Sequence, residues 1–200
     1  MRRLRACTVA LVLAVAAMLG CGGNQTSGPV RLPRTAPSVG PEATHRPPSL
    51  GTRAARGKPI AGLRCTRSTR ARFGVHLELF AARRVVLVPP GIGIAPPRTR
   101  AGAYVRGGRC SYPLRTREPT GVIEVQEGRL KNLGQFFAIW GQPLGHDRMA
   151  GIRGRVRAYV NGVPLRGDLR AVPLFKHAQI VLEVGGYVSP HFEYRFPSDL

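Results

Sequence analysis

The sequence predicts a mostly β domain, a β-rich α+β fold of antiparallel hairpins with one short helix that faces the core. Three observations support this prediction. Apolar and polar residues alternate with a period of two in several segments. Asn161 and Gly162 lie between two such segments, and both residue types accept the positive φ angles of a tight hairpin turn. One segment, 132–141, has a helical period instead.

The first half of the chain contains a predicted hairpin. Residues 75–80 alternate between apolar and polar positions, and the apolar run 85–88 follows after a short break. Such a pair of segments is typical of two strands joined by a turn. We also expect a brief extended piece at 92–94 and a strand at 122–125.

The second half contains the strongest hairpin signal, at 156–160 before the Asn161–Gly162 turn. A further strand is expected at 179–184, and the alternating aromatic residues at 192, 194 and 196 suggest a last one. Residues 75–94 and 156–184 have a similar strand–turn–strand order. We therefore expect two β-units.

The predicted helix, at about 132–141, begins at Asn132 as its N-cap and ends at Gly141 before a proline. Four large apolar residues fall on one of its faces: Leu133, Phe136, Phe137 and Trp140. This face is compatible with an aromatic ligand groove, but packing in the core of the β domain is the favoured interpretation.

Residues 1–20 have the features of a lipoprotein signal peptide. Positive charge at the start is followed by an apolar run of about 14 residues, shorter than the ~20 that span a bilayer. The run ends at Gly20–Cys21, the lipobox pattern, which predicts cleavage before Cys21 and a lipid on its thiol. An ordinary secretory signal and an uncleaved anchor are the alternatives. The predicted location is the outer face of the bacterial cell membrane.

Residues 21–60 are rich in proline, glycine and arginine and contain few apolar side chains. Such a composition does not offset the entropy of ordering, so we expect a disordered tether. The remaining residues, 61–200, are enough for a single β-rich domain with its own core.

Two cysteines remain in the predicted domain, Cys65 and Cys110. Outside the cytosol, a lone pair of cysteines in a small domain usually forms a disulfide. Closing a loop of about 45 residues would stabilise the fold by roughly 4 kcal/mol in the chain-entropy model. The alternative is two free buried thiols.

The formal net charge is +21, and 28 of the 31 basic residues are arginine. On an exported protein such charge favours anionic lipids or anionic envelope polymers as partners. The chain has no recognition-helix pattern, aromatic RNA-binding motif or zinc finger, so nucleic acid is not expected. A solvated basic surface is the simplest interpretation.

Catalytic motifs are missing from the sequence. It contains no G-x-S-x-G, no H-E-x-x-H and no phosphate-binding glycine-rich loop. His146 and Asp147 suggest an acid–base pair, but no nucleophile accompanies them and adjacent residues point apart. We therefore expect no catalytic residue, no cofactor and no enzymatic activity.

Several segments, in order, resemble a family of uncharacterised exported bacterial proteins that are often lipoproteins. The most specific segment is Leu-Gly-Gln-Phe-Phe-Ala-Ile-Trp-Gly at 133–141, and others lie at 76–80, 88–94 and 180–185. The resemblance spans nearly the whole domain. It implies an exported domain and no established activity.

The resemblance also implies a candidate metal site. Relatives carry His-x-His-x-His-Leu on the first strand, His-Thr-His-Asp after the second cysteine and Ile-His-Val-Glu on the next strand, a set that suits a transition metal. In this chain these motifs leave three candidate ligands: His76, Glu118 and Glu124. Arg115 and Arg117 replace two histidines. We expect them to form exposed cross-strand ion pairs with a glutamate: Glu118, Glu124 or Glu78.

These observations favour an uncharacterised, membrane-anchored extracytoplasmic lipoprotein whose β-rich domain binds or spaces something in the cell envelope without catalysis. The alternative is a metal-binding envelope protein with a degenerate site at His76, Glu118 and Glu124. An enzyme with an unrecognised site is the third hypothesis.

Overall fold

The structure, a computed structural model, describes residues 45–67, 70–71, 73–190 and 193–200. The predicted signal peptide, its cysteine at position 21 and most of the predicted tether lie outside these residues, so those predictions stay untested. Among the described helices, none has both the length and the apolar composition needed to cross a bilayer.

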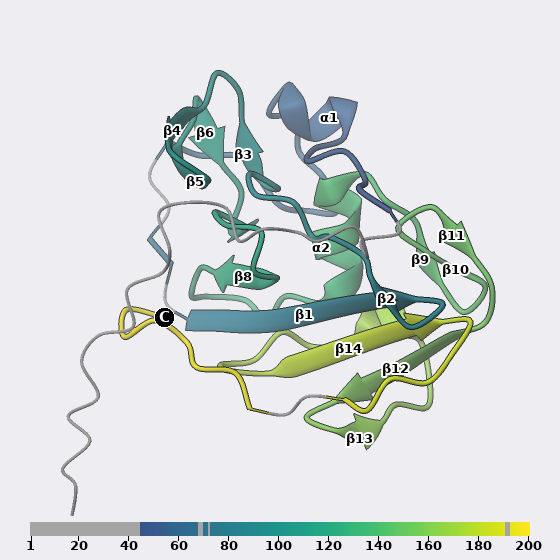
Figure 1. The fold of residues 1–200 in the computed structure, drawn as a ribbon. Coiled ribbons are helices and arrows are strands. Elements are labelled where there is room, and N and C mark those ends of the chain that lie inside the picture. Colours follow the sequence, from purple (N-terminus) through teal and green to yellow (C-terminus); the bar gives the residue numbers. More distant parts are fainter. Residues whose placement is uncertain (1–44, 68–69, 72, 191–192) are drawn as a thin grey trace, which may run out of the picture.

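A seven-stranded sheet forms the centre of the fold and confirms the mostly β class (Figure 1). Its strand order is β13-β12-β14-β1-β8-β7, and β2 pairs with the end of β1. β1 and β14 are parallel, whereas the other neighbours are antiparallel. The strands are β1 (Phe73–Ala81), β2 (Arg84–Val85), β7 (Leu114–Arg115), β8 (Val122–Val125), β12 (Val156–Val160), β13 (Val163–Pro164) and β14 (Gln179–Val184).

Three small sheets lie outside the main one: β3 with β6, β4 with β5, and β9 with β10 and β11. Their strands are β3 (Ile94–Ala95), β4 (Thr99–Ala101), β5 (Tyr104–Gly107), β6 (Cys110–Ser111), β9 (Leu144–Gly145), β10 (Arg148–Met149) and β11 (Ile152–Arg153). The helices are α1 (Thr52–Ala55), α2 (Leu133–Trp140) and the short 3₁₀ helix η1 (Leu169–Ala171).

The core lies between one face of the main sheet and α2 (Figure 1). Alternate residues of β1 point into it, and Leu77 and Leu79 are each 1% exposed. The register places them opposite Ile180 and Leu182 of β14, which are also buried. Residues on one strand face share a side of the sheet, so these pairs form a continuous apolar layer.

Helix α2 has the predicted position and ends. The side chain of Asn132 accepts a hydrogen bond from the Gln135 amide, and the Gln135 side chain accepts one from the Asn132 amide, a capping box. Gly141 ends the helix at φ 75°, a conformation that glycine adopts readily. Phe136, Phe137 and Trp140 are at most 1% exposed, which confirms that this face packs in the core.

Two predicted strands, 122–125 and 179–184, are observed with the same bounds. The predicted hairpin turn is also confirmed, because Asn161 and Gly162 have φ angles of 49° and 78°. The segments 75–94 and 156–184 do not form two units, however. Their strands β1, β2, β12, β13 and β14 belong to one sheet, since β14 returns to pair with β1.

The predicted last strand at 192–196 is wrong for its described part, since residues 193–200 contain no strand. The aromatic rings pack instead on side chains of the main sheet and its borders. Tyr194 stacks on His76, with ring centroids 3.9 Å apart, and Phe196 stacks on His177. β1 already has neighbours along both edges, so this segment lies across the sheet rather than beside it.

The predicted tether is too long at its C-terminal end. Residues 51–55 form a turn of helix with Ala54 only 1% exposed, and the Pro48 carbonyl accepts a hydrogen bond of 2.7 Å from the buried Trp140 indole. A buried indole N–H requires an acceptor, and this segment supplies it. The domain therefore includes residues from 45 onward.

The predicted disulfide is confirmed. Cys65 and Cys110 are bonded, with their Cα atoms 5.4 Å apart. The bond ties the segment before β1 to β6.

Candidate functional site

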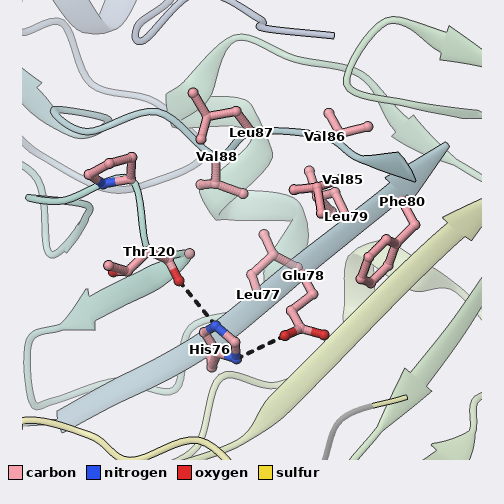
Figure 2. Close-up of a pocket in the computed structure, with 12 residues that line it drawn as sticks. His76, Leu77, Glu78, Leu79, Phe80, Val85, Val86, Leu87, Val88 and Thr120 are labelled. Carbon is pink, nitrogen blue, oxygen red and sulfur yellow. Dashed lines mark hydrogen bonds and ion pairs between the residues drawn. The ribbon is translucent and has the colours of Figure 1, made fainter. Parts of the chain in front are cut away.

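A pocket of about 220 Å³ opens at the middle of β1 (Figure 2). On the N-terminal side of the pocket, β8 pairs with the first part of β1. On its C-terminal side, β2 pairs with the last two residues of β1. The pocket occupies the opening between these two partners. Its lining is mostly apolar and includes Phe80, Val85, Val86, Leu87, Val88 and Pro119, together with His76, Glu78 and Thr120.

Gly121 brings the loop before β8 against β1 at this opening. The Gly121 carbonyl accepts a hydrogen bond of 2.9 Å from the Leu77 amide. Its φ is 78°, and a Cβ at this position would lie 2.3 Å from the Leu77 carbonyl oxygen. Only glycine therefore fits this approach, which sets one wall of the pocket.

His76 lies at the polar end of the pocket and is 6% exposed. Its Nε2 lies 3.0 Å from the Thr120 carbonyl oxygen, and since a carbonyl only accepts, Nε2 carries a hydrogen and donates it. Its Nδ1 faces the Glu78 carboxylate at 3.9 Å. The Tyr194 ring stacks on the His76 ring, and burial raises the pKa of the Tyr194 hydroxyl.

This geometry is suited to binding. The Nε2–H of His76 is already used by Thr120, and Glu78 is a second polar group that reaches the pocket, with its side chain 19% exposed. The pocket therefore offers apolar walls and one carboxylate acceptor.

Arg115, Arg117 and Glu124 form a separate cluster on β7 and β8. Arg115 Nε lies 2.6 Å from one Glu124 oxygen and Arg117 Nε 2.8 Å from the other. Arg117 also donates to the carbonyls of Val105 and Arg106 and lies over the Tyr104 ring. The predicted cross-strand pairing is confirmed, because Arg115 is opposite Glu124 in the register.

The predicted exposure of this cluster is wrong, since Arg115 is only 2% exposed and Glu124 only 9%. For Glu124 and Arg117 the contacts are long-range, because both line a small cavity together with Pro197, Asp199 and Leu200. A buried ion pair of this kind depends on both partners, so its role here is structural.

Glu118 lies beside this cluster at a cavity of about 40 Å³ that Glu124 also lines. It is 6% exposed, and its Oε2 has no hydrogen-bond partner among the described residues. Burial, with a smaller contribution from the Glu124 charge, raises the pKa of the Glu118 carboxyl.

The three candidate metal ligands are not gathered into one site. His76 lines the larger pocket, whereas Glu118 and Glu124 line the small cavity. Both Glu124 oxygens are bound by arginine. Within 45–67, 70–71, 73–190 and 193–200, no group of three His, Cys, Asp or Glu side chains is placed to hold a metal.

Sequence reasoning missed Glu78 and Gly121. Glu78 follows His76 by two residues, and period-two alternation places both side chains on one face of β1. Gly121 gave no comparable signal, because its role depends on the approach of two distant segments. The His146–Asp147 pair lies elsewhere, with Asp147 exposed beside Arg148 at 3.2 Å.

Comparisons with known proteins give no relatives for this chain: no family model, curated protein or solved structure matches it.

Proposed function

We propose that the protein is a membrane-anchored extracytoplasmic lipoprotein, whose β-rich domain binds an apolar group of its ligand in the His76 pocket without catalysis. The observation that carries the proposal is the apolar opening in the sheet at the middle of β1, with Glu78 as its carboxylate acceptor. The disulfide between Cys65 and Cys110 supports a location outside the cytosol.

The size of the pocket limits the ligand. About 220 Å³ is below the usual 300–1,000 Å³ of sites for drug-sized molecules, so the pocket holds one short chain or one ring. Such a group can belong to a small molecule or to a side chain of a partner protein. Glu78 favours a positively charged or hydrogen-bond-donating end, because an ionised carboxylate only accepts hydrogen bonds.

The experiment uses the full-length protein and three probes of similar size: hexylamine, hexanol and hexanoate. Binding is followed by NMR shifts of the His76 ring and the Glu78 amide. We expect hexylamine to bind most tightly and hexanoate least. Equal shifts for all three probes, or none, would contradict the proposed pocket.

Two tryptophan variants test the location of binding. V85W places an indole at the rim, where Val85 lines the pocket and is 48% exposed, and it should abolish hexylamine binding. V163W is the matched control, because Val163 is 66% exposed and lies on β13, away from the lining residues. Loss of binding in both variants would argue against this site.

The membrane anchor is tested separately. Mass spectrometry of the protein from bacterial membranes should give a diacylated N-terminal Cys21, and C21S should appear in the soluble fraction. An unmodified Cys21 with its upstream residues retained would contradict the lipoprotein assignment without affecting the pocket.

The metal-binding alternative has less support. Its three residues line two different cavities, and Glu124 is held by two arginines. Calorimetry with Zn²⁺ tests it directly. Stoichiometric uptake that is lost in H76A would favour the metal site over the apolar one.

A further inference from the structure

A second cavity, a groove of about 510 Å³, lies at the end of β14 where β11 meets β12. Three glycines and one valine form its floor: Gly154, Gly185, Gly186 and Val184. Three arginines line it: Arg153, Arg155 and Arg157. It shares no lining residue with the His76 pocket, so the two sites are independent.

Strand alternation explains why the arginines gather here. Val156 and Ala158 are 6% and 5% exposed and point into the core. Arg155 comes before Val156, and Arg157 lies between Val156 and Ala158. Both arginines therefore point outward, and both are exposed.

Neighbouring strands add further positive charge. Arg153 of β11 is opposite Arg148 of β10, and Asp147 lies beside this pair, at 3.2 Å from Arg148. The side chain of Arg83 lies against Gly186, since a Cβ on that glycine would be 2.7 Å from the Arg83 Cγ. Three arginines thus line the groove, and a fourth lies beside one of its glycines.

Little negative charge within the protein balances these groups. Arg157 pairs with Glu183 at 3.3 Å and Arg148 with Asp147 at 3.2 Å. In the described part of the chain, no ion pair is recorded for Arg153 or Arg155. Arg153 interacts with the Asp147 carboxylate at longer range and lowers its pKa, after the larger contribution of Arg148. Both arginines are exposed, so an external anion can reach them.

We infer that this groove binds a linear polyanion with repeating phosphate groups. A guanidinium presents paired N–H donors that match phosphate oxygens. Outward residues on an extended strand recur about every 6.7 Å. The phosphates of an inorganic polyphosphate are joined through single oxygens and lie closer together than this, so one chain presents several phosphates to the arginines of the groove.

The lining also separates this polymer from nucleic acid. Among the described residues, no aromatic side chain lines the groove, and single-stranded nucleic acids are usually held by stacking of bases on aromatic rings. A phosphate polymer has no bases, so its binding does not require aromatic rings for stacking.

The test measures binding of long-chain inorganic polyphosphate to the full-length protein by calorimetry at several salt concentrations. The variant R153A/R155A should bind about 10-fold or more weakly, and the slope of log K against log salt should fall by about 1.4, at ~0.7 per lost contact. The control R64A/R67A removes two exposed charges outside the groove and should lower affinity less than about 3-fold.

Three results would overturn the inference. Equal losses in R153A/R155A and R64A/R67A would mean that net charge alone binds the polymer. Tighter binding of a single-stranded oligonucleotide of equal charge would point to nucleic acid. Binding to phosphatidylglycerol vesicles that needs Arg153 and Arg155, without polyphosphate binding, would place the groove on a bilayer.

Discussion

Glu118 is a carboxyl group in a poor environment for its charge. It is 6% exposed, one oxygen has no hydrogen-bond partner among the described residues, and Glu124 lies nearby. Burial and the Glu124 charge raise its pKa in the folded protein. The folded state therefore holds the proton more tightly than the unfolded chain does, and stability falls as pH rises above the unfolded value of about 4.3.

E118Q should stabilise the protein at pH 7 by about 1 kcal/mol, because the amide resembles the protonated acid. The gain should shrink as the pH is lowered toward about 4, where the wild-type carboxyl is protonated in both states. Urea unfolding at both pH values measures this difference. E193Q, at an exposed position, is the control and should change little. A gain in E118Q that is independent of pH would contradict the argument.

The Arg115–Glu124 pair shows the opposite situation, a buried charge with its partner at 2.6 Å. E124Q should destabilise the protein by about 3 kcal/mol, because it removes the carboxylate charge that the Nε atoms of Arg115 and Arg117 both contact. Replacing Arg115 and Glu124 together, in R115L/E124L, should cost less than the sum of R115L and E124L, although Arg117 still loses its contact with Glu124. Urea unfolding of the single and double variants completes the cycle. Additive losses would mean that the two side chains do not depend on each other.

At the scale of elements, the loop before β8 depends on Gly121. G121A should destabilise the fold by about 1–2 kcal/mol from its left-handed backbone, plus a further cost because its Cβ would lie 2.3 Å from the Leu77 carbonyl oxygen. Gly62 is a matched control: its φ is 77°, and a Cβ added there would have no atom within 4 Å.

Thermal unfolding should therefore give a larger loss for G121A than for G62A, and G121A should also weaken hexylamine binding. Equal losses in the two variants would mean that the close approach to Leu77 is not required.

The elements that the sequence predicted well are those with local signals. Strand β14 has three apolar residues on the core face, and α2 has a cap and a stop within its own sequence. Their bounds follow from residues that contact one another along the chain.

The errors concern contacts between distant segments. The composition of residues 45–60 is that of a tether, but the Trp140 indole donates a hydrogen bond to the Pro48 carbonyl in this segment. The sequence pattern does not show this long-range contact. The alternation along β8 does not show that Glu124 is buried, because Pro197 and Leu200, which line the same small cavity, lie far along the chain. His76 was predicted as a candidate ligand, but its neighbours are Thr120 and Tyr194. The alternation of residues along β1 does not show that these two distant residues lie beside it.

At the scale of the whole molecule, the Cys65–Cys110 disulfide joins two segments on the helical side of the sheet. C65A/C110A should lower the free energy of unfolding by about 4 kcal/mol, since 45 residues separate the two cysteines. Urea unfolding with and without dithiothreitol measures the effect. The reductant should destabilise the wild type and leave C65A/C110A unchanged, and an equal response of both would assign the loss to another cause.

The position of β14 has a consequence for synthesis. It is the last strand in the described part of the chain, yet it lies between β1 and β12, so the two halves of the sheet share no ladder until it arrives. Joining β1 to it closes a loop of about 100 residues, which makes this pairing slow. A chain that emerges from the ribosome N-terminus first therefore lacks this central strand until residues 179–184 have been made. Under the proposed export, this order would keep the main sheet incomplete up to that point of synthesis.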